Sequence, residues 1–156
     1  MQVHQGFLHT EIKMTPDGPR LVEVNGRLGG GISGMIVRIG GPSLLEWAVR
    51  LALGHDVGPA PVLTDSKIAF YYYIVSPLLA TQVGSIEGLN ELSALPGIDE
   101  VRLNRPTGET VSSQESSHQG HVIRIDGMVE SHAELFDLID KQIPSAVSLT
   151  WTFLDS

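Results

Sequence analysis

Two alternating segments separated by a tight turn constrain the start of this chain most strongly. In Phe7–Met14, successive residues alternate between a mostly polar and a mostly hydrophobic set, with the two-residue period of a β-strand. The segment Thr15–Pro19, "TPDGP", is rich in turn-forming residues, and Arg20–Asn25 continues as a second strand-like run. The sequence therefore predicts an antiparallel β-hairpin.

The register of this hairpin decides which side chains face each other. If all five residues of the turn form the loop, Glu11 lies opposite Glu23 and His9 lies opposite Asn25. Side chains opposite each other share one face of the hairpin. Two carboxylates placed in this way repel each other unless protons or cations lie between them. A divalent cation that prefers oxygen ligands removes this repulsion, and Asn25 offers a third oxygen on the same face.

In the alternative register, the two glutamates do not form a pair. The metal-binding register begins with Met14 opposite Arg20, and a change of one residue in the loop places Glu11 and Glu23 on opposite faces. The two glutamates would then be solvated surface acids. The pattern by itself leaves both registers open.

Arg27 and three consecutive glycines follow the hairpin. A fixed guanidinium group suits a phosphate or a tetrahedral oxyanion. Gly29–Gly31 precedes a segment, Ile32–Ile39, that is expected to be helical, and free backbone amides at such a position attract anions. The ordinary alternatives are a surface arginine and a flexible turn. Together with the acidic pair, these residues favour a metal- and phosphate-binding site.

A segment rich in glycine and proline, "GHDVGPAPVLTD", divides the chain. Before it, Ser43 and Glu46 form a capping box that predicts a helix over residues 43–53. We therefore expect two modules, 1–60 and 61–156, with the boundary in this linker.

The second module predicts a small α+β lobe. Strands are expected at residues 68–75, 98–103, 121–126 and 147–153, and helices at residues 86–95 and 131–142. The resulting order, βαββαβ, is that of ferredoxin-like folds.

Composition narrows the classes of function. The 156 residues are enough for one domain or two small ones, and the net charge of −8 argues against a nucleic-acid binder or a protein of anionic membrane surfaces. The chain has no cysteine, which excludes disulfides, thiolate zinc sites and cysteine nucleophiles within it. No apolar run is long enough for a membrane span, and no signal peptide is recognisable at the N-terminus, so a cytoplasmic protein is expected.

Two further groups of residues could carry chemistry. His118 and His121 fall in a polar, serine-rich loop with no third ligand nearby, which favours a solvated loop over a zinc site. The run Tyr71–Tyr73 could stack on a planar ligand, but successive strand residues point to opposite faces. We therefore expect at least one of these tyrosines in the core.

The segment "HTEIKMTPDGPRLVEVNGRLGGG" resembles the metal-binding end of the ATP-grasp superfamily, and is most similar to L-amino-acid ligases and carboxylase-like members. The segments "LLATQVGSIEGLNELSALPGIDEVRL" and "HVIRIDGMVESHAELFDLIDKQI" resemble the C-terminal lobe of the amino-acid ligase branch. The resemblance implies an α+β fold, in which the C-terminal half of an ATP-grasp domain precedes the ferredoxin-like lobe. It also implies an enzyme that joins a small carboxylate to an amine or a thiol through an acyl-phosphate, with Mg-ATP.

The resemblance also implies a metal site. Glu11, Glu23 and Asn25 match the residues that hold the Mg²⁺ or Mn²⁺ ions bridging the phosphates of ATP. One departure is Gly26, where many members of the superfamily have proline. A second is Gly34, where relatives often have proline, so the resemblance does not fix where the helix around it starts.

The remaining site residues are assigned to the substrate and the phosphate. Arg27 would be the catalytic residue that holds the transferred phosphoryl group. Gly30 and Gly31 would present backbone amides to the substrate or its acyl-phosphate, and His9 shares the acidic face and would contact the ligand. Such a site works by positioning and electrostatic stabilisation.

An ATP-grasp site is formed by two lobes, and only five residues precede Gly6. We therefore expect the chain to be a C-terminal fragment of a ligase that is inactive by itself. The alternative is a truncated, non-catalytic module that mediates interaction or dimerisation. A small-ligand regulatory domain is a weaker third hypothesis, which rests on topology only. A homo-oligomer is expected under the first two hypotheses, because the absence of a lobe exposes apolar surface.

Overall fold

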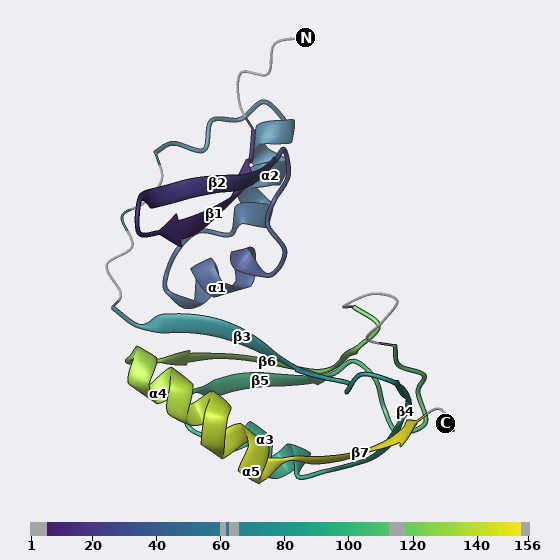
Figure 1. Ribbon diagram of the computed structural model, residues 1–156. Coiled ribbons are helices and arrows are strands. Elements are labelled where there is room, and N and C mark those ends of the chain that lie inside the picture. The colour runs from purple at the N-terminus through teal and green to yellow at the C-terminus, as the bar shows by residue number, and fades with distance from the viewer. Residues whose placement is uncertain (1–5, 60–61, 63–65, 113–117, 154–156) are drawn as a thin grey trace. The chain divides into compact units, whose positions relative to one another are not determined.

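The computed structural model describes residues 6–59, 62, 66–112 and 118–153 and divides into two compact units, Met1–Asp65 and Ser66–Ser156 (Figure 1). The module boundary expected at residues 60–61 lies outside the described residues. No helix in the part of the chain that the structure describes is both long and apolar enough to cross a membrane.

The first unit begins with the predicted antiparallel hairpin. Strands β1 (His9–Thr15) and β2 (Gly18–Asn25) are joined by a tight turn in which Pro16 and Asp17 are the loop residues. Gly18 follows the loop with a φ of 102°, a backbone conformation that favours glycine. The "TPDGP" segment therefore forms a shorter loop than the five residues expected.

The shorter loop changes the register next to the turn. Met14 pairs with Pro19, so the expected pairing of Met14 with Arg20 is wrong. The register then shifts by one residue at a β-bulge in β2, where Val22 is the extra residue. Such a bulge places two residues of one strand against one residue of the other.

Two helices follow the hairpin. Helix α1 (Ile32–Arg38) is short, and helix α2 (Leu44–Ala52) begins at the predicted capping box, where the Glu46 amide donates to Ser43 Oγ at 3.2 Å. After α2 the chain turns at Gly54, whose φ is 77°. The predicted helix and its boundaries are thus confirmed to within about one residue.

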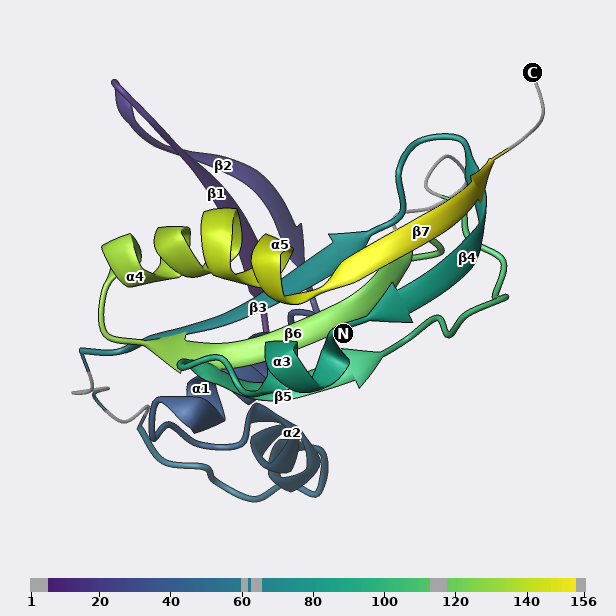
Figure 2. The same ribbon diagram turned by 90° about the horizontal axis from the view of Figure 1, so that it is seen from below.

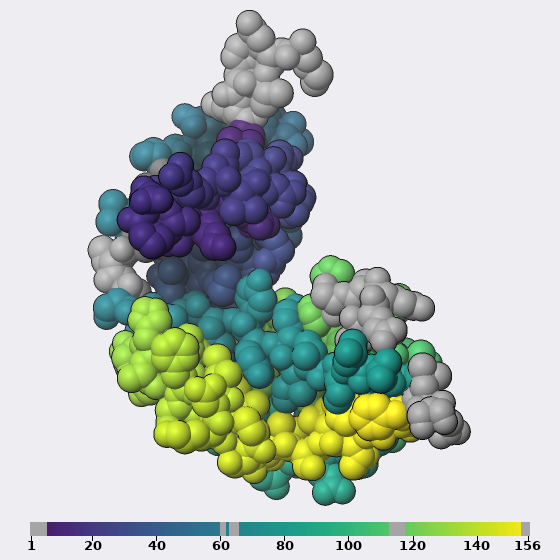
Figure 3. All heavy atoms as spheres, viewed as in Figure 1, coloured from purple at the N-terminus to yellow at the C-terminus, as the bar shows by residue number. Residues whose placement is uncertain are grey.

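The first unit has little interior of its own. None of its described residues is buried. One face of the hairpin, which we call the apolar hairpin face, is hydrophobic and largely exposed. It consists of Leu8, Ile12, Met14, Leu21 and Val24, which have exposed fractions between 49% and 74%. The hairpin, shown in purple in Figure 3, lies at the surface of this unit.

The second unit contains a three-stranded antiparallel sheet in the order β3–β6–β5. Its strands are β3 (Ile68–Val75), β6 (His121–Val129) and β5 (Ile98–Leu103) (Figure 2). The predicted α+β class is confirmed, whereas the βαββαβ order predicted from the sequence is not confirmed in detail.

Helices cover one face of this sheet (Figures 1 and 2). They are α3 (Leu89–Ser93), α4 (His132–Asp137) and α5 (Ile143–Ala146), with a π-helical turn, Leu138–Gln142, between the last two. The Glu134 amide donates to Ser131 Oγ at 3.2 Å, which confirms the second predicted capping box. The helical backbone extends beyond the predicted end at Gln142 to Ala146, with Pro144 near the start of α5.

The hydrophobic core lies between the sheet and these helices. The buried hydrophobic residues among those described all belong to the second unit. They are Phe70, Ala80, Val83, Leu92, Val111, Val122, Ile123, Ile125, Val129, Leu138, Ile143 and Val147. The second unit therefore has the core that a stable domain requires.

A strand that the sequence analysis did not predict completes the second unit. β4 (Ala80–Glu87) pairs with β7 (Ser148–Phe153), so the last strand joins β4 in a separate two-stranded sheet. The predicted helix at residues 86–95 is correspondingly shorter. Glycine weakens the strand pattern, yet position 84 requires it, because a Cβ atom on Gly84 would collide with Oγ1 of Thr150.

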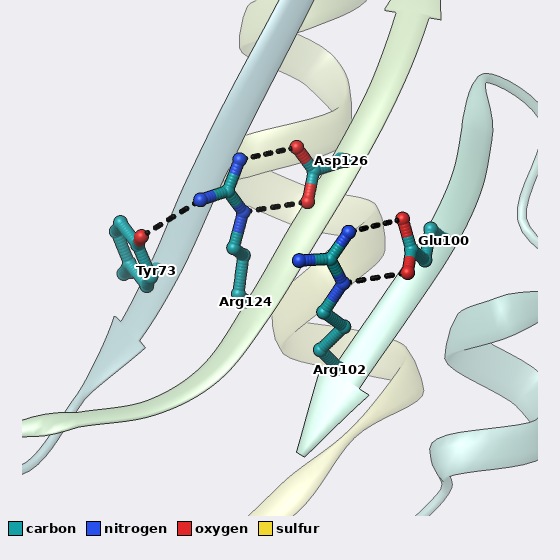
Figure 4. Close-up of polar contacts among 5 residues, drawn as sticks. All are labelled: Tyr73, Glu100, Arg102, Arg124 and Asp126. Atoms are coloured by element: carbon teal, nitrogen blue, oxygen red, sulfur yellow. Dashed lines mark hydrogen bonds and ion pairs between the residues drawn. The ribbon is translucent and has the colours of Figure 1, made fainter. Parts of the chain in front are cut away.

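Two arginine–carboxylate pairs lie on the sheet face opposite the helices (Figure 4). Arg124 donates to both carboxylate oxygens of Asp126 at 2.7 Å and to the Tyr73 hydroxyl at 3.2 Å. The hydrogen bonds that Arg124 donates to Asp126 raise the pKa of Arg124 above its usual value. Arg102 makes a similar fork to Glu100 at 2.6 and 2.9 Å, but this pair is exposed.

These two pairs provide a matched test of burial. Asp126 is only 1% exposed, so Asp126→Ala leaves a partly buried guanidinium without its counter-charge, and we expect a loss of about 3–5 kcal/mol of unfolding free energy. Glu100→Ala removes an exposed partner and should cost less than about 1 kcal/mol. Urea unfolding followed by Trp151 fluorescence in a Trp47→Phe background measures both. Equal losses in the two variants would contradict the prediction.

Candidate functional site

The hairpin brings the predicted acidic pair together. Glu11 is directly opposite Glu23, and His9 is directly opposite Asn25. These pairings are the expected ones, but they arise in an unexpected way. The tight turn places Ile12 opposite Leu21, and a regular ladder would then place Glu11 opposite Val22. The bulge restores the acidic pair by skipping one residue of β2.

The acidic face of the hairpin holds unpaired polar atoms. The Glu11 side chain is 48% exposed, whereas the His9 side chain is 20% exposed. The two side chains approach to 4.0 Å between His9 Nδ1 and Glu11 Oε1, which is too long for a hydrogen bond. His9 Nδ1 and the amide nitrogen of Asn25 are both buried without a hydrogen-bond partner. Buried polar atoms usually have a hydrogen-bond partner, and a ligand bound at this face would supply one.

The glycine turn packs against this face at one point. A Cβ atom on Gly29 would lie 2.8 Å from Cδ2 of His9, closer than real contacts allow. Gly31 is the N-cap of α1 with a φ of 75°, which a residue other than glycine adopts only with strain. Gly30 has open space around it. The sequence pattern pointed to Gly30 and Gly31 but not to Gly29, whose proximity to His9 is visible only in three dimensions.

Arg27 leaves the hairpin two residues beyond Asn25. It is exposed, and its Nη1 donates to the carbonyl of Leu28 at 3.1 Å. This contact folds the side chain back toward its own loop. Arg27 is therefore available to an external anion, but a ligand would have to draw it out of this position.

The donor set suits a hard cation. Glu11, Glu23 and Asn25 offer oxygen ligands on one partly exposed face, as Mg²⁺ prefers when substrate phosphates supply its remaining ligands. Among the described residues, no group of three or more His, Cys, Asp or Glu is arranged to hold a metal ion. The three oxygen donors would leave the remaining positions around a cation open to other ligands.

In the second unit, His118 and His121 contact aromatic rings. His121 stacks on Tyr73 with ring centroids 4.0 Å apart, and His118 contacts His121 edge-on at 5.5 Å. Burial lowers the pKa of His121, and His118 lowers it further. The tyrosines alternate as predicted, since Tyr72 packs against the core while Tyr71 and Tyr73 lie on the other face.

Comparisons with known proteins point to one fold. The L-amino acid ligase from Bacillus licheniformis superimposes with a TM-score of 0.76 and 20% identity over 96% of this chain and 37% of its own. Phosphoribosylglycinamide synthetase from Anaerococcus prevotii gives a TM-score of 0.69 and 14% identity over 93% of this chain and 37% of its own. Carnosine synthase 1 of Gallus gallus is 34% identical over 106 residues, 65% of this chain and 11% of that protein. No family model matches the chain.

The chain therefore has the fold of the C-terminal portion of ATP-grasp ligases, which confirms the resemblance drawn from its motifs. It spans only about a third of the length of the two solved structures, and a smaller part of the carnosine synthase.

Because the two carboxylates repel each other, removing the charge of one of them should stabilise the hairpin. Like charges directly opposite each other destabilise a strand pair, so Glu23→Gln should raise the unfolding free energy of the metal-free protein by about 0.2–1 kcal/mol at low salt. Added salt should reduce the gain. Urea unfolding followed by Trp47 fluorescence in a Trp151→Phe background measures the effect.

The control for this measurement is Asp17→Asn, which changes the same charge in the turn away from the pair. It should leave stability nearly unchanged. If Glu23→Gln destabilises the metal-free protein, the two carboxylates do not repel each other as their register implies.

Proposed function

We propose that this chain is the C-terminal part of an ATP-dependent ligase that joins a small carboxylate to an amine or a thiol. The observation that carries the proposal is the register of Glu11 opposite Glu23, with Asn25 on the same face and Arg27 next along the chain. These residue types at these positions serve phosphoryl transfer, because it depends on positioning and on neutralising charge. The ATP-grasp fold supports the same activity.

Each residue has a defined part in this proposal. Glu11, Glu23 and Asn25 would hold Mg²⁺ or Mn²⁺, which when bound neutralises the phosphate charge of ATP and orients it. Arg27 would bind the phosphoryl group that passes to the substrate carboxylate and stabilise the charge there.

The backbone and His9 complete the site. The amides of Gly30 and Gly31, together with His9, would contact the substrate or its acyl-phosphate. We propose that these 156 residues do not turn over ATP by themselves, since the matched ligases are much longer. The cytoplasmic location expected from the sequence stays a prediction.

Metal and nucleotide binding separate the roles of these residues. Wild-type protein should bind Mn²⁺ weakly in an electron paramagnetic resonance titration, and Glu23→Gln should weaken this binding at least tenfold. Arg27→Ala should leave Mn²⁺ binding unchanged and weaken binding of Mg-ATP in calorimetry, because the guanidinium contacts the phosphate and not the ion.

Asp17→Asn is the matched control, because it removes one carboxylate outside the acidic pair. Its Mn²⁺ affinity should equal that of wild type. If Mn²⁺ does not bind to wild type, or if Asp17→Asn and Glu23→Gln have the same effect, the acidic pair is not a metal site.

A second candidate function is that of a non-catalytic interaction module. The apolar hairpin face favours it, because contiguous exposed hydrophobic residues usually mark a surface that another protein covers. In this alternative the covering protein is a second copy of the chain, which gives a homo-oligomer. The two candidates differ in whether function depends on the acidic face of the hairpin or on its apolar face.

Sedimentation velocity distinguishes the two faces. If the apolar face mediates self-association, the mass of wild type should rise with concentration and Ile12→Ser should abolish the rise, since it places a hydroxyl in the interface. Glu23→Gln, on the opposite face, should associate like wild type. A wild-type protein that remains monomeric at every concentration would rule out this interface.

A further inference from the structure

We propose that His9 is a positioning residue for the Glu11 carboxylate, and that it couples the glycine turn to the acidic pair. The inference rests on the proposed function, since it concerns how the cation site is assembled. It gives His9 a role through Glu11 in addition to the ligand contact proposed above. The evidence is the orientation of the imidazole ring, which has a different neighbour on each edge.

One edge of the ring faces the glycine turn. A Cβ atom at Gly29 would lie 2.8 Å from His9 Cδ2 and 3.2 Å from His9 Nε2. The same atom would lie within clash distance of the Ile32 side chain. The absence of a side chain at Gly29 therefore lets the turn pack directly against the imidazole and restricts how the ring can rotate.

The other edge of the ring faces the acidic pair. His9 Nδ1 lies 4.0 Å from Glu11 Oε1 and is buried without a hydrogen-bond partner. A neutral imidazole with its proton on Nδ1 can donate to this carboxylate after a shift of about 1 Å, which brings the two atoms to hydrogen-bond distance. Hydrogen bonds in ligand-free sites are often long and tighten when the ligand binds.

A carboxylate that holds a cation through one oxygen can accept a hydrogen bond at the other. Groups that orient metal ligands in this way typically contribute about 10- to 100-fold to metal affinity. The cross-strand neighbour of His9 is Asn25, whose amide nitrogen is also buried and unpartnered. If Asn25 Oδ1 binds the cation, its nitrogen faces away from the ion, which agrees with a site prepared for a ligand.

Two conservative substitutions test which edge of the imidazole matters. The amide nitrogen of His9→Asn can reach the position of Nδ1, whereas that of the longer His9→Gln reaches the position of Nε2. We expect His9→Asn to bind Mn²⁺ within about threefold of wild type and His9→Gln to bind about tenfold more weakly. Electron paramagnetic resonance titration measures the affinities, and thermal unfolding without metal shows whether the two variants are equally stable.

A glycine pair tests the coupling independently of His9. Gly29→Ala should displace the ring and weaken Mn²⁺ binding about tenfold, whereas Gly26→Ala has open space and no positive φ and should bind like wild type. This pair remains informative if a substitution at His9 prevents folding.

The outcomes separate the inference from the proposed function. If wild type binds no Mn²⁺, or Glu23→Gln binds as well as wild type, the metal site itself is wrong. If Glu23→Gln loses affinity while His9→Asn and His9→Gln are indistinguishable, the metal site stands and the role of His9 is overturned. Equal affinities of Gly29→Ala and Gly26→Ala would overturn the coupling to the glycine turn.

Discussion

The arrangement of the candidate site depends on one extra residue in β2. The turn between the strands is tight, and a regular ladder continued from it would place Glu11 opposite Val22 and separate the two glutamates onto different faces. The bulge at Val22 cancels this offset, and the pairs Glu11–Glu23 and His9–Asn25 then share one face. The proposed cation site depends on this register, because none of these four residues would indicate a cation site by itself.

The site lies on the unit of the chain that has no buried residue among those described. The second unit differs, since a core of hydrophobic side chains joins its sheet to its helices. The acidic face of the hairpin is therefore partly open to solvent, and the apolar hairpin face is exposed as well. Under the proposed function, substrate would supply the remaining contacts of the acidic face.

The residues of the candidate site were proposed from the sequence, but not the way in which the hairpin brings them together. The carboxylates, the amide and the arginine were proposed because hard oxygen donors and a guanidinium form a chemically specific set. The contact between Gly29 and the His9 ring was missed, because it joins residues from opposite ends of the hairpin region. The triple glycine indicated a close approach of the backbone to another group, but not that this group is the His9 side chain.

The sequence by itself determined the hairpin, the two capping boxes and the alternation of the tyrosines, because each depends on residues within a few positions of one another. Only the tertiary structure decided the register of the acidic pair and the existence of β4. The register results from a turn that is shorter than expected and from a bulge that offsets it. The alternating pattern of hydrophobic and polar residues predicts neither the length of the turn nor the position of the bulge. β4 contains Gly84, which weakens the strand signal, and the reason for that glycine is the side chain of Thr150 on the distant strand β7.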